Sequence, residues 1–583
     1  MKAIAIIFYL IFAAAVIGFY HLLRHRTGPE LKPGPYAIRW ILAAGFIIRV
    51  ILAMSIEGFS TDIGLFRFWS QKAAEDLFHM YHGDFYLDYP PGYLYVLFLV
   101  GKTASLLGLT GSEALYLLLL KLPSVIADLI TAWLLYRLAR NRLPGIWPHV
   151  MACIYVFNPA VLINAAVWGQ VDSFLVLFIA LGLLLLDGKR PELSGLPFAF
   201  AVLIKPQGLI FLPVVFFELL KRKDWKLFVK TAVCGLATVT VLVLPFALNH
   251  EPSWIFKLYM STAEGYKYVS LNAFNFFSLI GANLKPDSEQ FIFFNYQVWG
   301  YIFIFVMLVY TAILHLKGKG RHLTHVSSLV LSMGVFMLSI RMHERYMFPV
   351  LYFLAVIFIL TRDKWSLLFY GLASFTIYVN TLVVLERMIR DDYPHVPPND
   401  PVLLLISLIN VLLFAAVLVW SWRNAVRQKT DPIAFRTRPV AEQRQRGSLW
   451  LRSHKQAAPQ DDKYVPLRVN KRDAAVMAVM TLVYLALALF NLGSFDVPQT
   501  EWSGRGTRDG FIIDLGAEKQ VSRITFYSGL GKGTYHVWYQ DSEGLFRIRW
   551  MTWKWTISTS GMYLRFQRPP PLLSSVSANR EAC

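Results

Sequence analysis

Long apolar stretches recur along almost the whole chain, and they constrain its fold more than any other feature. A helix needs roughly 20 predominantly apolar residues to cross a hydrocarbon core about 30 Å thick. Thirteen runs approach or reach that length: 3–22, 38–56, 93–108, 112–137, 150–166, 170–187, 228–248, 297–316, 325–340, 347–361, 365–384, 402–422 and 473–490. A single short run could be a buried helix of a soluble protein. A series of them predicts a polytopic α-helical membrane protein with about 13 spans, some of them broken or re-entrant.

The composition agrees with this class. Of the 583 residues, 56% are hydrophobic and only 16% are charged, and the mean hydropathy is +0.46, so the chain cannot be one soluble globule. The first run follows Lys2 and contains Ala13-Ala14-Ala15, which are weak features of a signal peptide. Because it lacks a small-x-small site followed by a polar start, we expect a retained span.

The net charge of +20 would suit a nucleic-acid-binding protein, but the positions of the basic residues argue against one. They cluster in short connectors between apolar runs and in the segment 423–472, which carries 13 Lys+Arg against 4 Asp+Glu. The connectors are Arg24 to Arg26, Arg137 to Arg142, Lys189-Arg190, Lys221 to Lys223 and Lys317 to Arg321. This distribution is typical of cytoplasmic loops beside anionic membrane lipids, and we expect no nucleic-acid partner.

Five polar clusters border the apolar runs, and a topology argument puts all of them on one membrane face. They are Thr61-Asp62, Asp88 to Gly92, Trp168 to Ser173, Asn272 to Asn275 and His343 to Tyr346. If the basic connectors are cytoplasmic, counting the crossings from Arg24 onwards places every cluster outside. Polar groups gathered at one boundary predict a reaction or transport site on the extracytoplasmic side.

Two apolar stretches do not fit this simple count. The stretch 194–219 is interrupted by Lys205-Pro206-Gln207, and because proline cannot continue a helix ladder, we expect two half-helices with Lys205 at the tip. The stretch 93–137 must cross an odd number of times, and Pro123 suggests a second break in it. Broken helices at membrane depth are tolerated where they line a cavity.

Each cluster also has a purely structural explanation. Asp62 follows a span end and could be a solvated cap, and Asp88 to Gly92 could simply begin a helix, since proline suits the first turn. Asp172 lies in a turn between two spans and could bond backbone amides. His343 and Arg345, at another span end, could extend to water.

Lys205 is harder to explain in that way. An ammonium group at membrane depth is costly and usually faces a partner or a cavity. The neighbouring residues of the last cluster, Arg341, His343 and Arg345, form a compact cationic group of the kind that binds a phosphate.

Together these motifs resemble the GT-C superfamily of integral membrane glycosyltransferases and, within it, bacterial relatives of the GPI-anchor mannosyltransferases. The resemblance covers roughly residues 38–425, and several motifs occur in the family's order. The motifs are Thr61-Asp62 followed by Phe66 to Trp69, Tyr89-Pro90-Pro91, Lys121 with Asp128, Asn158-Pro159, Trp168 to Ser173, Lys205-Pro206-Gln207 and His343 to Tyr346.

The resemblance implies an activity and a set of roles. The activity is transfer of a sugar from a polyprenyl-phosphate donor to a hydroxyl of a glycan, lipid or protein acceptor at the outer face, with inversion at the anomeric carbon. Asp62 matches the family's loop aspartate and is the expected general base. The expected donor-phosphate residues, which would stabilise charge on the departing lipid phosphate, are Lys205, Arg341, His343 and Arg345. The expected substrate-binding residues are Asp88, Tyr89, Trp168, Gln170, Asp172, Asn272, Asn275 and Glu344.

We expect no cofactor. No residue spacing demands a divalent metal ion, and the members of the resembled family mostly act without one. The cysteines Cys153, Cys234 and Cys583 are far apart, and they indicate neither a disulfide framework nor a metal-thiolate site.

The C-terminal region has a different pattern. Phe511 to Gly516, Val521 to Tyr527 and Tyr535 to Tyr539 alternate apolar and polar residues as strands do. They resemble the first half of a discoidin-type (galactose-binding-like) β-sandwich, although about 90 residues is short for a full sandwich. Such modules bind carbohydrate or only pack, and the tail 569–583 has a disordered composition.

The expected division of the chain follows. Residues 1–37 hold the N-terminal span and a cytoplasmic connector, 38–422 the GT-C-like transmembrane catalytic domain, 423–472 a basic cytoplasmic linker, 473–490 the last span, and 491–583 the extracytoplasmic β domain.

Two other functions are compatible with parts of this pattern. A transporter or flippase of lipid-linked sugars would share the spans, the cationic pocket and the broken helices. It would not need the Asp62 carboxylate in an external loop. A noncatalytic scaffold that presents the C-terminal domain would leave Lys205 and the His343 group unexplained.

Overall fold

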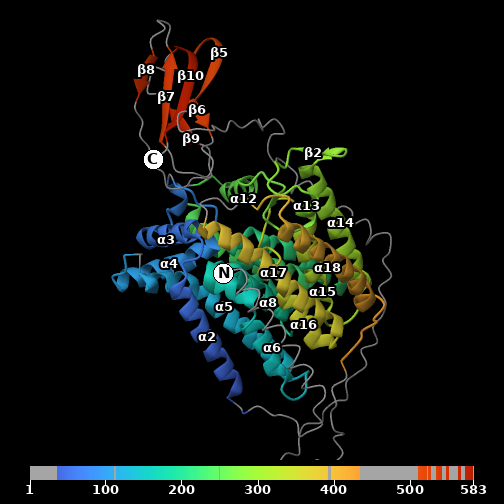
Figure 1. The fold of residues 1–583 in the computed structure, drawn as a ribbon. Helices are drawn as coiled ribbons and strands as arrows, with labels where there is room; N and C mark the ends of the chain where they lie inside the picture. The colour runs from blue at the N-terminus through green and yellow to red at the C-terminus, as the bar shows by residue number, and fades with distance from the viewer. Residues whose placement is uncertain are drawn as a thin grey trace, which may run out of the picture.

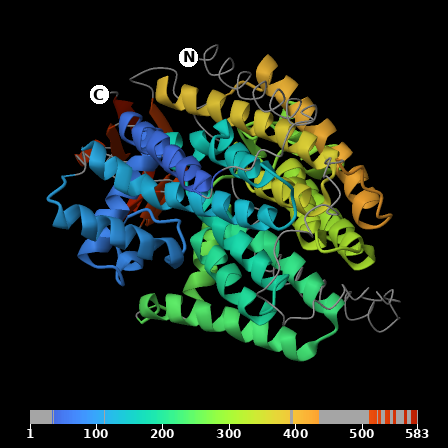
Figure 2. The same cartoon turned by 90° about the horizontal axis from the view of Figure 1, so that it is seen from below.

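The computed structural model describes residues 34, 36–83, 85–110, 113–248, 250–251, 253–390 and 396–433, together with the backbone of the strands β5 to β10 between residues 510 and 581. The predicted first span 3–22, the last span 473–490 and residues 434–472 of the predicted linker 423–472 lie outside the described residues. Within 36–433 the chain forms a bundle of packed helices (Figure 1; Figure 2 views it from below).

The helices follow the order of the predicted apolar runs. They are α2 (Ala37–Ser55), α3 (Ser60–Glu75), α4 (Pro91–Leu106), α5 (Ala114–Arg140), α6 (Trp147–Val156), α7 (Pro159–Leu162), α8 (Asp172–Leu186), α9 (Gly195–Ile204), α10 (Leu212–Arg222), α11 (Trp225–Val243), α12 (Trp254–Glu264), α13 (Phe276–Leu279), α14 (Tyr296–Lys317), α15 (Leu323–Leu338), α16 (Val350–Thr361), α17 (Lys364–Arg390) and α18 (Pro401–Ala425). Short 3₁₀ turns occupy Met80–His82, Pro191–Ser194, Pro206–Phe211 and Leu244–Phe246, and one π-helical turn occupies Ile163–Trp168.

The predicted count of about thirteen spans is not confirmed. Six helices of the described residues are long and apolar enough to cross a membrane, namely α2, α5, α11 with its 3₁₀ extension, α14, α17 and α18, and a bent pair at 147–168 makes up to 7. These helices support a multi-pass membrane protein. The predicted runs 170–187, 325–340 and 347–361 form the shorter helices α8, α15 and α16.

The short apolar helices form the centre of the bundle. α16 has 12 residues, which at 1.5 Å per residue is about 18 Å, well short of a hydrocarbon core. Nearly all side chains of α15 and α16 are buried. An apolar run does not by itself distinguish a lipid-facing span from a helix surrounded by protein, so the described residues do not confirm the predicted count.

The breaks predicted in the apolar stretches 194–219 and 93–137 have different outcomes. The break at Lys205-Pro206 is confirmed, because α9 ends at Ile204 and Lys205 is extended (φ −157°, ψ 140°) before a 3₁₀ turn. The suggested break at Pro123 is wrong, since α5 continues through it for 27 residues. Membrane helices tolerate proline where neighbours satisfy the freed backbone groups.

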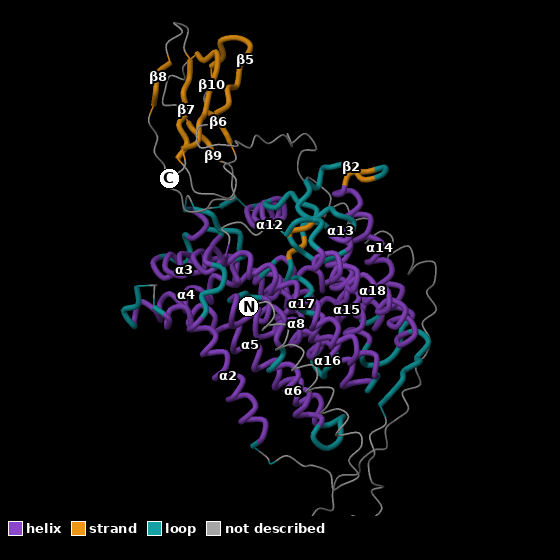
Figure 3. The backbone as a smooth tube through the Cα atoms, in the orientation of Figure 1, coloured by secondary structure: helices purple, strands orange, loops and turns teal. Residues whose placement is uncertain are grey.

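The strands are few and short in the helical region. β1 (Ser270–Leu271) pairs in parallel with β4 (Met342–His343), and β2 (Gln290–Phe291) forms an antiparallel hairpin with β3 (Phe294–Asn295) (Figure 3). The β1–β4 pairing joins two predicted polar clusters that are some 70 positions apart in sequence (270 against 342).

Three of the six C-terminal strands overlap the three runs in which the sequence pattern predicts strands, whereas β8, β9 and β10 were not predicted, and β10 lies in the tail 569–583 that was expected to be disordered. The six strands are β5 (Gly510–Gln520), β6 (Arg523–Phe526), β7 (Thr534–Gln540), β8 (Phe546–Arg549), β9 (Met562–Arg565) and β10 (Leu572–Glu581). β5, β10, β7 and β8 form one antiparallel sheet in that order, and β6 pairs with β9. The discoidin resemblance and carbohydrate binding stay predictions.

Candidate functional site

Asp62 lies in the first turn of α3, directly after the loop that follows α2. A helix N-terminus favours a carboxylate through its unpaired amides and its dipole. Ile63, Phe66, Trp69, Ser70 and Ala73 on one face of α3 are buried, as the amphipathic pattern predicts, and this face packs against α4 (Figure 1). The packing fixes the helix, and so the position of its first-turn aspartate.

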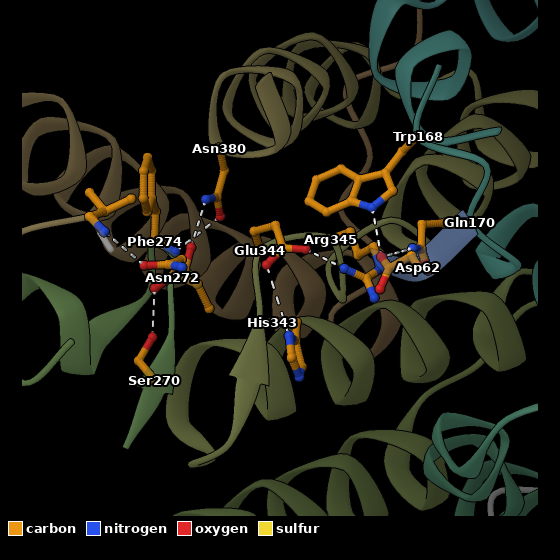
Figure 4. A network of polar contacts seen from close by, with 12 residues as sticks. Asp62, Trp168, Gln170, Ser270, Asn272, Phe274, His343, Glu344, Arg345 and Asn380 are labelled. Atoms are coloured by element: carbon orange, nitrogen blue, oxygen red, sulfur yellow. Dashed lines mark hydrogen bonds and ion pairs between the residues drawn. The ribbon is translucent and has the colours of Figure 1, made fainter. Parts of the chain in front are cut away.

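Two donors from a second segment reach the same oxygen of Asp62. Trp168 Nε1 donates to Oδ2 at 2.9 Å, and Gln170 Nε2 donates to Oδ2 at 2.7 Å (Figure 4). Within the part of the chain that the structure describes, no hydrogen bond to Oδ1 is formed. One carboxylate oxygen is therefore oriented by the protein, while the other remains able to accept a proton.

A bent helix delivers these donors. α6 and the helical segment 159–168 are inclined by 44° at Asn158-Pro159, because proline removes a ladder hydrogen bond and restricts the residue before it. The Asn158 side chain stabilises the bend by accepting from Ala160 N at 2.9 Å and donating to Tyr370 Oη at 2.9 Å. The π-helical turn then ends at Gly169, whose φ of +86° suits glycine.

Lys121 joins the segment before Asp62 to the segment before Trp168. Its side chain is fully buried in α5, and Nζ donates to Ile56 O (2.5 Å), Ala166 O (3.1 Å) and Val167 O (3.0 Å). A Cβ at Gly58 would lie 2.7 Å from the carbonyl oxygens of residues 167 and 168. The two segments are thus in backbone contact, with one ammonium group bridging their carbonyl ends.

Asp172 holds two predicted phosphate-binding cations together. Its Oδ1 accepts from Lys205 Nζ at 2.8 Å, and its Oδ2 lies 3.5 Å from Arg345 Nε. All three side chains are at most 12% exposed. The Arg345 guanidinium also stacks over the Trp168 ring at 5.1 Å, and the Lys205 ammonium lies 5.3 Å from the Tyr346 ring centroid. These contacts connect the cations to the residues that hold Asp62.

His343 and Glu344 directly precede Arg345 in the loop between α15 and α16. The Arg345 Nη1 group donates to Glu344 Oε1, and the Glu344 side chain is 1% exposed. Burial raises the pKa of the Glu344 carboxyl, while the Arg345 cation opposes that rise. Glu344, predicted to bind substrate, therefore supports Arg345.

His343 departs from its predicted role as a cation. Burial, together with the charges of Arg345 and Lys205, holds the pKa of His343 well below its usual value. The imidazole is therefore neutral near pH 7 and can offer a hydrogen bond but no full charge to a phosphate. Its ring lies edge-on to Tyr266 at 5.1 Å and 5.0 Å from Tyr346.

Asp88 and Tyr89 line the same end of the bundle. Tyr86 Oη donates to Asp88 Oδ2 at 2.8 Å, and burial raises the pKa of Asp88, with the nearby Asp62 charge contributing. The Tyr89 ring packs between Phe66 (5.5 Å) and Trp69 (5.6 Å). Asp88 is thus a second carboxylate close to Asp62, and Tyr89 belongs to the aromatic packing beneath it.

The geometry does not support a substrate role for Asn272 and Asn275. Asn272 Oδ1 accepts from Asn283 Nδ2 at 3.1 Å and from Val396 N at 3.2 Å, and its backbone has a φ of +59° (Figure 4). Asn275 Nδ2 donates to Phe336 O at 3.0 Å, and Asn275 Oδ1 caps α13. Both amides hold the loop that carries them in place, and their substrate role stays a prediction.

Arg341 is also separated from the cations that it was grouped with. Its Nε and Nη2 groups bind Asp287 Oδ2 at 2.7 and 2.5 Å, and its Nη1 group donates to Ala263 O at 2.6 Å. A φ of +61° at Arg341 turns the backbone there, so residues only four apart in sequence have different partners. Arg341 fastens the segment between α12 and α14, and its assignment to the phosphate site stays a prediction that these contacts do not support.

The structure thus brings several of the predicted site residues together, and sequence reasoning missed several residues that support them. Lys121 was recognised as part of a motif without a role, although a lysine within an apolar run is itself a signal of a buried partner. Tyr86 and Asp287 carried no such signal. Within the described ranges, no three His, Cys, Asp or Glu residues form a group that could hold a metal ion.

Comparisons with known proteins point to one class. Residues 86–340 match the model of glycosyltransferase family 87. Over 227 residues, or 36% of this chain, the sequence is 25% identical to the dolichyl pyrophosphate Glc1Man9GlcNAc2 alpha-1,3-glucosyltransferase of Arabidopsis thaliana. The match spans 44% of that relative's length. The family match supports a membrane glycosyltransferase.

Among solved structures, the chain is similar to ArnT from Cupriavidus metallidurans bound to undecaprenyl phosphate. The similarity covers 67% of this chain and 78% of that chain, at 15% sequence identity and a TM-score of 0.39. Similarity at this level is too low to transfer residue roles.

Proposed function

We propose that this protein transfers a hexose, with mannose the first candidate, from a polyprenyl-phosphate donor to an acceptor hydroxyl at the outer membrane face. The observation that carries the proposal is the Asp62 carboxylate, which Trp168 and Gln170 hold by one oxygen next to the buried cations Lys205 and Arg345. A base and a cationic site are the two groups that such a displacement requires.

Asp62 acts as the general base. The acceptor oxygen attacks the anomeric carbon from the face opposite the phosphate, and its proton passes to Asp62 as the new C–O bond forms. The bond between the anomeric carbon and the phosphate oxygen breaks, so the product has the inverted configuration. Because Trp168 and Gln170 both bind Oδ2, Oδ1 is the oxygen that takes the proton.

Lys205 and Arg345 receive the leaving group. A polyprenyl-phosphate sugar is a phosphodiester with one negative charge, and the departing polyprenyl phosphate carries a second. Two cations that share Asp172 can turn part of their hydrogen bonding towards that growing charge in a site largely shielded from water. The neutral His343 contributes an N–H group beside them.

The remaining carboxylates and amides bind sugar hydroxyls. Asp88 lies near Asp62, and its carboxyl group accepts a hydrogen bond from Tyr86. It is therefore placed to bind a hydroxyl of the acceptor or the donor. Gln170 has the same opportunity while it orients Asp62. We expect no metal cofactor, and we expect membrane lipids to surround the helical domain.

Two features outside the site support a lipid-linked donor. The helices of the bundle are apolar enough to span a membrane, so a prenyl chain can remain in the bilayer while its phosphate enters the site. The Arabidopsis relative is named for a dolichyl pyrophosphate glycan, which is also lipid-linked. Its sugar, glucose, is the second donor to test.

The test is transfer by the purified, reconstituted protein supplied with labelled polyprenyl-phosphate mannose, then glucose, and a glycan or lipid acceptor. Asp62→Asn should lower the transfer rate about 10²- to 10⁴-fold, the range expected for loss of a general base. Glu57→Gln is the matched control, since that carboxylate is 52% exposed in the preceding loop, and it should leave transfer unchanged.

The outcomes separate the alternatives. Undiminished transfer by Asp62→Asn would remove the base assignment, and retention of the anomeric configuration would remove direct displacement. If no donor supports transfer while labelled lipid-linked sugar crosses the bilayer, the protein is a transporter.

A further inference from the structure

The β2–β3 hairpin exposes apolar side chains that the described part of the chain leaves largely uncovered. Its turn consists of Ile292 and Phe293, which are 69% and 80% exposed. The next residue, Phe294, is also exposed. The segment 290–295 contains no charged residue. An exposed run of this kind normally marks a contact surface.

The backbone of the turn is strained by the residue that it carries. Phe291 pairs with Phe294, so Ile292 is the first residue of a two-residue turn, and its φ is +60°. Glycine is the residue that suits this position, and a β-branched side chain there is a genuine outlier. The chain keeps an isoleucine side chain at a conformational cost, which indicates that the side chain itself is used.

The hairpin is joined rigidly to α14. Trp299 Nε1 donates to Phe291 O at 2.8 Å, and the Trp299 ring packs against Phe294 at 5.7 Å. Asn295, the last residue of the hairpin, caps α14 by accepting from Val298 N at 2.9 Å. The turn therefore has a fixed position at the beginning of this candidate span.

The side of α14 that supports the hairpin is its apolar exposed side. Trp299, Val306 and Ile313 are seven residues apart and lie on one face of the helix. Val306 and Ile313 are exposed apolar residues of the span, and in a membrane protein such a face contacts lipid. Figures 1 and 3 show the hairpin protruding beyond the first turn of α14. The contact between the Phe294 and Trp299 rings connects the hairpin to this side of the helix.

We propose that the β2–β3 hairpin is a membrane-surface anchor whose turn, Ile292 and Phe293, inserts into the interfacial region of the bilayer. Aromatic and aliphatic side chains at the level of the lipid headgroups contribute favourable free energy when they are partly buried among the acyl chains. The hairpin follows the external loop that Arg341 and Asn272 fasten. Insertion would hold that loop, and with it the Arg345 region, at a constant height above the lipid.

The test replaces single residues with the photo-crosslinking amino acid p-benzoylphenylalanine in the full-length protein, reconstituted in vesicles of phosphatidylethanolamine and phosphatidylglycerol. The sites are Phe293 at the turn, Val306 as a lipid-facing control, and Glu289 at the polar base of the hairpin as an aqueous control. Phospholipid adducts on the peptides are measured by mass spectrometry after illumination.

Adduct formation at Phe293 should approach that at Val306 and exceed that at Glu289 at least about tenfold, as expected for a side chain held among acyl chains rather than in water. Crosslinking of Phe293 to a second copy of the chain, or a Phe293 yield no higher than that of Glu289 while Val306 reacts, would overturn the proposal. The measurement does not depend on catalytic activity, so it stands apart from the proposed function.

Discussion

Trp168 Nε1 donates a 2.9 Å hydrogen bond to Asp62 Oδ2, although the two residues are 106 positions apart in the chain. The same indole ring lies under the Arg345 guanidinium at 5.1 Å. One side chain thus contacts both the proposed base and a proposed phosphate ligand. The position of Trp168 therefore affects both the orientation of the proposed base and the position of the cation that would bind the leaving group.

Trp168→Phe should impair the chemical step more than donor binding. Phenylalanine keeps an aromatic face for Arg345 but cannot donate to Asp62, and a hydrogen bond to a charged group is worth about 1.5–3 kcal/mol. We expect kcat to fall about tenfold or more at nearly unchanged KM for the donor, measured by initial rates of transfer. A rise in donor KM with kcat retained would show that the ring matters only through Arg345.

Arg345→Gln and Arg341→Gln should have different effects on the donor. Arg345 shares Asp172 with Lys205, whereas Arg341 is bound to Asp287. Loss of a preorganised ligand to developing charge costs about 10²- to 10³-fold in rate, and we expect such a loss, with weaker donor binding, only for Arg345→Gln. Arg345→Lys, which keeps the charge but loses the planar fork, should be intermediate.

Arg345→Gln and Arg341→Gln serve as controls for each other. Both variants remove an arginine that binds a carboxylate, so elution as a monodisperse species and a normal melting temperature confirm that each one folds. If Arg341→Gln reduces transfer as much as Arg345→Gln, the separation of the two arginines in the structure does not govern function.

The same two arginines show what could be predicted from sequence. Alternation of apolar runs and basic connectors correctly gathered Asp62, Asp172 and Arg345 at one end of the bundle, because hydropathy governs which segments cross a membrane. It could not separate Arg341 from Arg345, since that depends on the positive φ at Arg341 and on Asp287, which is some 50 residues upstream (287 against 341). Hydrogen-bond partners follow tertiary packing.

Helix length was predictable only in part, for a similar reason. The run 347–361 is as apolar as a true span, yet α16 has 12 residues and is enclosed by protein. Proline likewise ended a helix beside Lys205 but not at Pro123. Whether neighbours satisfy the freed backbone groups decides the outcome, and neighbours are not visible in a local pattern.

Lys121 should act as a positioning residue for Asp62. It does not contact the proposed phosphate cations, but it bridges the carbonyl groups of Ile56 and Val167. Lys121→Met leaves these carbonyls without their donor, so the loop before Asp62 loses its register. We expect kcat to fall with little change in donor KM, and Lys121→Arg, which can still donate, to recover part of kcat.

Arg49→Met is the matched control for Lys121. Arg49 also connects α2 with α5, through a fully buried ion pair with Asp128 of 3.1 Å, but it lies away from the loop before Asp62. Breaking a buried pair costs about 3–5 kcal/mol, so this variant should melt at a lower temperature while the folded fraction keeps its kcat. An equal fall in kcat for both variants would reduce Lys121 to a structural role.

His343 should make the protein less stable in mild acid. Its folded pKa lies well below the ordinary value of 6.5, so below about pH 6.5 the unfolded chain takes up a proton that the folded chain does not. The stability contributed by neutral His343 is present above that pH and is lost as pH falls towards the folded pKa. The pKa of Glu344 is raised, so its contribution to stability changes with pH in the opposite direction. Glu344 is present in both proteins compared, so this contribution is common to them.

The measurement is the melting temperature of the wild type and of His343→Gln between about pH 7.5 and about pH 5.5. Glutamine is neutral throughout, so the wild type should lose more stability over this interval, by about 1 kcal/mol for one pH unit below the unfolded pKa. Parallel melting curves for the two proteins would mean that folded and unfolded chains take up the proton equally, so that the pKa of His343 is not lowered by folding. A wild type that instead gains stability relative to His343→Gln as pH falls would hold His343 protonated in the folded state, and His343 would then supply a third cation to the phosphate site.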